Sequence, residues 1–171
     1  MLLVIACASL KAQELIQNNK TTAVTFKIKN IGMSVDGSFN EIAVNSNFNK
    51  NNLIESYINA TIKVNSINTN NSKRDTHLLE DDFFDAAKYS YIKLMSTKIE
   101  KISGSSYRLE AKLTIKKTTK NIVIPLNISE NEDSVTVRSS FKLNRRDYNV
   151  GGRSWVMSNT VKIQIVYVAK K

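Results

Sequence analysis

Few side chains in this sequence are suited to acid–base, nucleophilic or metal chemistry. The chain has a single histidine, His77, and a single cysteine, Cys7. Multi-histidine metal sites, zinc sites with several cysteines and an intramolecular disulfide are therefore excluded within one chain. The sequence also lacks the G-x-S-x-G, G-x-G-x-x-G, P-loop and H-E-x-x-H motifs. We expect no metal and no catalytic cofactor, and an enzyme is the least favoured class.

The acidic residues around His77 are the remaining candidates for catalysis. Asp75 precedes His77 by two positions, but residues two apart on a helix point in different directions. A structural or capping role for His77 is therefore favoured over Ser/His/Asp catalysis. Asp81, Asp82 and Asp85 could form a metal cluster or an acid–base pair, and a solvated helix face is the favoured interpretation.

The segment 144–153 concentrates three arginines, two glycines and a tyrosine between two expected strands. One hypothesis is a basic lip near a cavity mouth, where Arg145, Arg146 and Arg153 contact a phosphate or quinone head group. The favoured alternative is an ion-paired corner in which Asp147 neutralises one arginine.

The elements that must position these residues are mostly strands. Past residue 20, apolar side chains recur at every second position, and short polar loops indicate antiparallel neighbours. Eight strands with one apolar face predict a barrel or a sandwich, and the length of the third strand favours a tall barrel with room for a ligand. The expected strands cover about 24–28, 35–44, 54–65, 91–102, 107–115, 122–128, 135–143 and 161–167.

One segment departs from the strand period. Residues 72–75 resemble a capping box with Asp in place of Glu. Apolar residues from Leu79 onward then recur at helical spacing. We expect one helix over about 73–87, between the third and fourth strands, with Leu79 and Phe83 buried and Asp81 exposed.

Length and composition indicate one globular domain. The chain has 171 residues, of which 42% are hydrophobic and 23% charged, and a formal net charge of +10. This charge keeps a polyanion-binding or nucleic-acid-binding barrel as the alternative function. The lysines are spread along the outward strand faces rather than clustered, so nucleic acid is not an expected partner.

The N-terminus has the features of a targeting segment. Residues 2–10 are apolar and too short to span a bilayer as a helix, and residues 11–13 resemble a cleavage region, although no Lys or Arg precedes the run. We expect a signal peptide over 1–13, a domain over 14–171, and a periplasmic or secreted location. A loose lipobox ending at Cys7 supports lipoprotein anchoring as the minority interpretation.

Several motifs carry a family resemblance. RDTHL at 74–78 and DFFD at 82–85 resemble the RD-x-HL…FFD signature of the YceI-like family. GSF at 37–39, LTI at 113–115 and NRRDY at 144–148 resemble further motifs of the same family, in the same order. Each motif alone is weak, but their shared order is specific, and together they cover nearly all of residues 20–169.

The resemblance implies an extended, eight-stranded, lipocalin-like antiparallel barrel exported to the periplasm. It also implies that a long polyisoprenoid or a similar amphiphilic lipid occupies the apolar tunnel of the barrel. The sequence departs from the family pattern where Lys117 replaces a glycine, Tyr89-Ser90 a Tyr-Pro pair, Leu94 a phenylalanine and Asn30 a histidine.

The predicted function is therefore non-enzymatic binding of a polyisoprenoid, quinone or fatty lipid by desolvation of its tail. Contact with a membrane surface and a monomeric or homodimeric state are both open. Phe39 and Ile62 are the favoured ligand contacts because they lie within long strands, and Trp155 is expected to plug the barrel or line its mouth. The inward-facing residues expected on the tunnel wall are Phe26, Ile28, Phe39, Ile58, Ile62, Leu94, Phe141 and Ile163.

Overall fold

A computed structural model gives the structure of residues 14–171. The predicted signal peptide over 1–13, and Cys7 within it, lie outside these described residues. Within the described part of the chain, no helix is long and apolar enough to cross a membrane.

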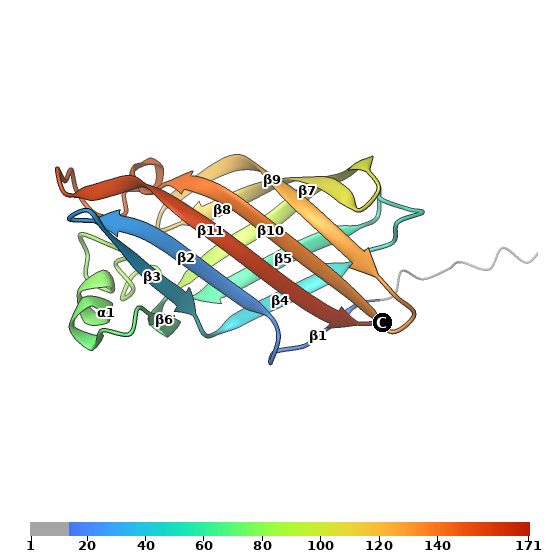
Figure 1. Cartoon of the computed structure of the whole chain (residues 1–171), viewed down its shortest axis with the longest axis horizontal. Coiled ribbons are helices and arrows are strands. Elements are labelled where there is room, and N and C mark those ends of the chain that lie inside the picture. The colour runs from blue at the N-terminus through green and yellow to red at the C-terminus, as the bar shows by residue number, and fades with distance from the viewer. Residues whose placement is uncertain (1–13) are drawn as a thin grey trace, which may run out of the picture.

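The chain forms one curled antiparallel sheet with a short helix, α1 (Ser72–Leu78), at one end (Figure 1). Two 3₁₀ turns, η1 (Val64–Ser66) and η2 (Arg145–Tyr148), interrupt the chain near the same end. The strands are β1 (Ile16–Gln17), β2 (Ala23–Asn30), β3 (Met33–Phe39), β4 (Ile42–Asn47), β5 (Tyr57–Lys63), β6 (Ile67–Asn68), β7 (Tyr91–Ser103), β8 (Ser106–Ile115), β9 (Thr118–Glu130), β10 (Ser134–Asn144) and β11 (Met157–Lys170).

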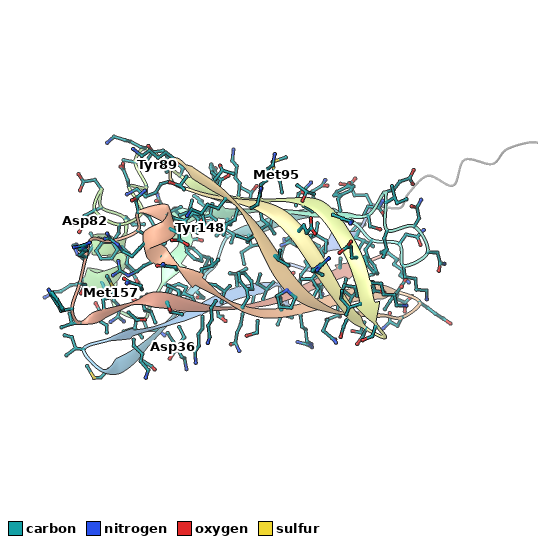
Figure 2. The ribbon with its side chains drawn as sticks, turned by 90° about the horizontal axis from the view of Figure 1, so that it is seen from above. Asp36, Asp82, Tyr89, Met95, Tyr148 and Met157 are labelled. Carbon is teal, nitrogen blue, oxygen red and sulfur yellow. The ribbon has the colours of Figure 1, made fainter. Side chains whose placement is uncertain are left out.

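Short turns join β2 to β3, β7 to β8, β8 to β9 and β9 to β10, so these strands are antiparallel neighbours in the sheet. The full sheet order is β4-β5-β7-β8-β9-β10-β11-β2-β3-β6, and β1 adds to β11. In β8, buried side chains alternate with more exposed ones, so one face of the strand lines the interior. Figure 2 shows the outer face, from which Asp36 and Met95 project on different sides of the molecule.

β4, at one edge of the sheet, is joined to β1 through a side chain rather than through a full strand ladder. Gln17 of β1 reaches β4, where its Nε2 donates to the Ile42 carbonyl at 2.8 Å and its Oε1 accepts from the Val44 N–H at 2.6 Å. The Leu15 N–H also donates to the Ser46 carbonyl at 3.0 Å. The side-chain amide thus replaces a backbone pair and satisfies edge groups of β4 that would otherwise be unpaired.

The predicted mostly-β antiparallel fold with one helix is confirmed for residues 14–171, but the strand boundaries differ. Nine strands in this range have six or more residues, rather than eight. The run expected over 35–44 is two strands, β3 and β4, separated at Asn40 and Glu41. The strand expected from residue 54 starts at Tyr57, because Ile54 lies in a loop and is 98% exposed.

The helix is shorter than predicted. It ends at Leu78, and residues 79–90 form a series of turns in which Asp85 takes a positive φ of 50°. The Phe84 N–H donates back to the Leu78 carbonyl, which folds this segment over the interior. A continuing helix would point adjacent side chains about 100° apart, whereas here both Phe83 and Phe84 face inward.

Candidate functional site

The inner faces of the strands enclose an apolar cavity of about 320 Å³. That volume lies at the lower end of the range of ~300–1,000 Å³ found for small-molecule sites. Its wall combines aliphatic and aromatic side chains from both halves of the sheet. The structure places on this wall all eight side chains predicted to face a tunnel: Phe26, Ile28, Phe39, Ile58, Ile62, Leu94, Phe141 and Ile163. Their contact with a ligand stays a prediction.

The cavity meets solvent beside α1. Among its wall residues within 14–171, only His77 is exposed, with 54% of its side chain accessible. Asn30, at the end of β2, and Met157, at the start of β11, are paired across the sheet, and both line the cavity. These three residues frame an opening, called the mouth below, at the α1 end of the molecule.

The opposite end is closed by a packed core. Leu15 and Phe48 are buried there, and Phe48 packs edge-on against Tyr107 with ring centroids 5.4 Å apart. The Tyr167 and Ser46 hydroxyls are hydrogen-bonded at 2.6 Å. Burial raises the pKa of Tyr167, and the bond to Ser46 opposes that rise. The cavity is therefore a tunnel with one closed end, and a ligand's polar group would have to lie at the mouth.

Arg74 and Asp75 anchor α1, which covers the tunnel beside the mouth, to Thr69. The Asp75 carboxylate accepts from the N–H and the hydroxyl of Thr69, at 2.9 and 2.5 Å. The Arg74 guanidinium donates to the Thr69 hydroxyl and carbonyl, both at 2.8 Å. Asn71 caps α1 by accepting from the Arg74 N–H at 3.0 Å. Asp75 and His77 do not bond to each other, so they do not form a catalytic dyad.

Two phenylalanines of the turn segment extend the cover over the tunnel. Phe84 packs edge-on against Phe39 of β3 at 6.1 Å, and Phe83 packs edge-on against His77 at 4.9 Å. The Gly151 N–H donates to the Asp82 carbonyl at 2.9 Å, which joins this segment to the loop before β11. Leu79 and Phe83 are only half-buried, whereas the predicted exposure of Asp81 is confirmed.

Arg145 organises the loop between β10 and β11 from inside the protein. The residue is 5% exposed, and its guanidinium donates to the carbonyls of Val150, Gly151 and Gly152 at 2.9–3.0 Å. Further bonds reach the Ser158 carbonyl and the Asn159 side chain. Burial, and secondarily the charge of Arg146, lowers the pKa of Arg145. Its donors are thus used within the fold rather than offered to a head group.

The rest of the predicted basic lip is dispersed. Arg146 is half-buried and donates to the Gly151 carbonyl at 3.2 Å, and Arg153 is exposed. Asp147 faces Lys120 at 3.8 Å, so the prediction that it neutralises one of the arginines is wrong. The corner is held by guanidinium–carbonyl bonds instead of an ion pair.

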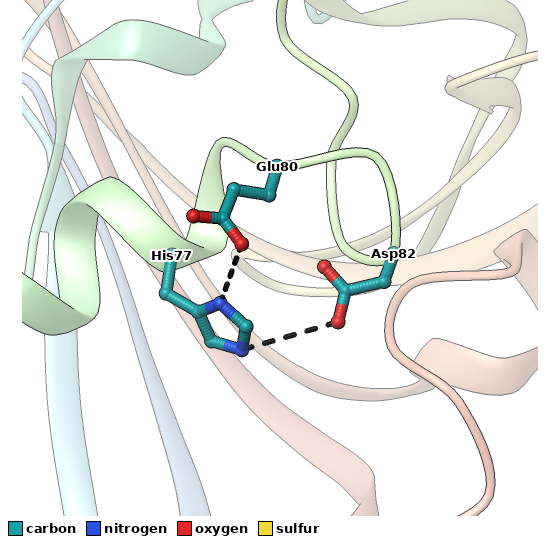
Figure 3. Close-up of side chains that lie close together, drawn as sticks. All are labelled: His77, Glu80 and Asp82. Atoms are coloured by element: carbon teal, nitrogen blue, oxygen red, sulfur yellow. Dashed lines mark hydrogen bonds and ion pairs between the residues drawn. The ribbon is translucent and has the colours of Figure 1, made fainter.

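His77, Glu80 and Asp82 are the described residues whose donor atoms could hold a metal ion, since these atoms lie within 4.8 Å of one another (Figure 3). The His77 Nδ1 lies 2.8 Å from a Glu80 oxygen, and Nε2 lies 3.9 Å from an Asp82 oxygen. All three are exposed at the rim of the mouth. Each nitrogen of the His77 ring therefore faces one carboxylate.

The prediction that Trp155 plugs the barrel or lines its mouth is wrong. The residue is fully exposed and absent from the tunnel wall, so it neither plugs nor lines the barrel. Sequence reasoning also missed polar residues near the mouth and wall residues of β8 and β9, although the alternation in those strands carried the signal. The missed residues include Asn30, Thr69, Arg74, Tyr148, Leu113, Ile115, Ile122 and Ile124.

Comparison with known proteins places this architecture in a family. Residues 16–169 match the family model described as the YceI-like domain. A UPF0312 protein of Photorhabdus laumondii is 30% identical over 133 residues, which cover 74% of this chain and 69% of that protein. A UPF0312 protein of Vibrio parahaemolyticus is 31% identical over 103 residues, so the chain spans about half (54%) of that relative's length.

Solved structures share the fold. BcnA of Burkholderia cenocepacia superposes with a TM-score of 0.85 at 22% identity, covering 90% of this chain and 99% of that one. The YCEI protein of Campylobacter jejuni gives 0.73 at 27% identity, covering 80% and 85%. A polyisoprenoid binding domain from Saccharophagus degradans gives 0.74 at 16% identity, covering 94% and 99%. With nearly the whole described chain matched by the family model, this protein belongs to the YceI-like domain family.

Proposed function

We propose that this protein binds the apolar tail of a polyisoprenoid, quinone or fatty lipid in its tunnel, without chemical conversion. The observation that carries the proposal is a tunnel with almost wholly apolar walls, filled at its Tyr107 and Tyr167 end by buried side chains. Water in such a tunnel has few polar partners, so its replacement by a hydrocarbon tail is favourable.

The physical basis of binding is desolvation. About ten buried methylenes at ~0.8 kcal/mol each give roughly 8 kcal/mol, which corresponds to about micromolar affinity before association costs. Those costs are moderated because the wall is already formed by hydrogen-bonded strands, so little ordering accompanies binding.

The proposed orientation puts the tail toward Tyr107 and Tyr167 and the polar end at the mouth. The deep part of the tunnel is closed by buried side chains, whereas Asn30, Arg74 and His77 supply polar atoms at the opening. The likeness to the polyisoprenoid binding domain of Saccharophagus degradans supports an isoprenoid tail as one ligand class.

Substitution of one wall residue tests the proposal. Ile62→Asn introduces an unsatisfied amide into an apolar wall and should weaken binding of a fluorescent long-chain fatty acid about tenfold or more. Lys93→Asn is the matched control, because Lys93 is exposed on the neighbouring strand β7, paired with Thr61 next to Ile62.

Titration of both variants by probe fluorescence, with circular dichroism to confirm folding, gives the comparison. Selective loss in Ile62→Asn supports tail binding inside the tunnel. Equal affinity in a folded Ile62→Asn protein would move the site elsewhere.

Polyanion binding is the weaker candidate. Lys27 pairs with Asp36 at 3.0 Å, and Lys98 and Arg108 both pair with Glu100, so outward cations are interspersed with carboxylates. Oligonucleotide affinity that falls steeply with salt concentration would favour this alternative.

Export is proposed from residues 2–13 alone. Mass spectrometry of the protein from its native host should show a chain starting near Gln13. A diacylated Cys7 would instead establish lipoprotein anchoring, and retention of residues 2–10 would contradict both.

A further inference from the structure

Exposed apolar side chains gather at the mouth end of the molecule. Of the ten large hydrophobic residues exposed within 14–171, four lie in or directly beside two adjoining turns. Ile31 and Met33 are 67% and 68% exposed, Trp155 is fully exposed, and Val156 is 55% exposed. These four residues are called the tip below.

The tip is a built part of the fold, continuous with the mouth. The Ile31 N–H donates to the Val156 carbonyl at 2.8 Å, which joins the β2–β3 turn to the segment before β11. Each turn directly adjoins a mouth residue, since Asn30 precedes Ile31 and Met157 follows Val156. A lipid leaving the tunnel at the mouth would pass beside these two segments.

Ile31, one of the four residues of the tip, also has a strained backbone conformation. Ile31 has a φ of 51°, a conformation that glycine and asparagine adopt readily and that is unfavourable for a β-branched residue. An isoleucine that is both strained and solvent-exposed does not stabilise the turn. Strain of this kind is typical of functional positions.

The charges beside the tip are cationic. Lys29 and Arg153 flank the two turns, both are exposed, and neither forms an ion pair with a carboxylate of residues 14–171. Glu80 and Asp82 lie on the α1 side of the mouth, where both face His77. The cationic side chains thus adjoin the apolar ones, as in proteins that bind membrane surfaces.

We propose that the tip docks the mouth onto a lipid bilayer, with Trp155, Ile31 and Met33 in the interfacial layer and Lys29 and Arg153 near anionic head groups. This inference rests on the proposed lipid-binding function and adds the source of the lipid. Tryptophan is favoured in the interfacial layer because its ring is apolar and its N–H is polar. Four side chains are too few for a stable protein interface, which needs about 800 Å² from each partner.

The single tryptophan of the chain makes docking directly measurable. The full protein is mixed with vesicles of phosphatidylethanolamine and phosphatidylglycerol, and separately with vesicles of phosphatidylcholine. The emission of Trp155 should shift to shorter wavelength and be quenched by lipids with brominated acyl chains. The anionic vesicles should give the tighter partition, because only they attract Lys29 and Arg153.

The variant Ile31→Asn/Met33→Gln tests the tip while keeping Trp155 as the reporter. Asparagine suits the positive φ at position 31, so this turn should not unfold. Vesicle partition should weaken about tenfold or more, since ~1.4 kcal/mol of lost apolar burial is enough for that. Ile102→Asn is the control, because Ile102 is 60% exposed at the far end of β7.

The outcomes separate docking from tunnel binding. Loss of vesicle partition in the tip variant, with unchanged affinity for the soluble fatty acid probe, supports docking. Absence of any spectral shift in the native protein, or equal partition of the tip variant and Ile102→Asn, would overturn docking. Binding of the fatty acid probe by Ile62→Asn is measured without vesicles. A failure of the proposed tunnel function would therefore appear in the probe measurement and not in the vesicle measurement.

Discussion

The tunnel wall depends on a glycine opposite a phenylalanine. Gly37 of β3 is paired with Phe26 of β2, and a Cβ on Gly37 would lie 2.3 Å from the Phe26 ring. The Phe26 ring therefore lies over bare backbone and packs on Phe39 at 5.7 Å. The absence of a side chain at position 37 sets the position of an aromatic wall residue.

Gly37→Ala should push the Phe26 ring into the tunnel. Overpacking of this kind lowers the free energy of unfolding by about 1–3 kcal/mol, and the displaced ring should also weaken probe binding. Gly152→Ala is the control, because a Cβ at Gly152 meets nothing within 4 Å. Urea unfolding and probe titration measure both effects, and equal results for the two variants would contradict this packing.

At the scale of elements, the motifs at 74–78, 82–85 and 144–148, which carried part of the family resemblance, form contacts that hold the mouth end together. Arg74 and Asp75 anchor α1 to Thr69, Phe83 and Phe84 cover the tunnel, and Arg145 holds the loop before β11. All lie at the mouth end. Arg74, Asp75 and Arg145 are of residue types that are common in catalytic sites. In this protein they hold in place the segments that surround the mouth.

Asp75→Ala tests the anchoring of α1. It leaves the buried N–H and hydroxyl of Thr69 without their acceptor, which costs about 1–3 kcal/mol. Hydrogen exchange should quicken over residues 69–90 more than in the strands. Asp81→Ala, an exposed acidic neighbour, should leave exchange near native levels, and indistinguishable exchange in the two variants would refute the anchoring role.

The strands that the sequence predicts well are those in which apolar and polar residues alternate regularly. Strand 107–115 was predicted well because buried and exposed positions alternate regularly over its length. The prediction of one strand over 35–44 is wrong because the apolar pattern continues across the break at Asn40. That break is set by the pairing of β3 with β6 and of β4 with β5 rather than by the local sequence. The helix was overextended because Phe83 and Ala86 fit a helical period while long-range packing bends the chain.

At the scale of the whole molecule, the apolar wall could be predicted from the alternation of inward-facing and outward-facing residues along each strand. The position of the mouth could not be predicted in this way. Inward-facing residues share a parity within each strand, so the sequence identified Phe26, Ile62 and Phe141. Which end opens depends on segments that lack periodicity, namely 69–90 and 145–156. The exposure of Trp155 was missed for the same reason, because exposure at a loop tip leaves no periodic signal.

Native mass spectrometry of the protein purified without detergent tests the central claim most directly. We predict a population heavier than the polypeptide by one lipid, which solvent extraction releases as a molecule with a long apolar chain. The Ile62→Asn variant should carry that lipid at a much lower fraction than Lys93→Asn. A folded native protein that shows only the polypeptide mass, and that takes up no long-chain lipid when one is supplied, would contradict the account.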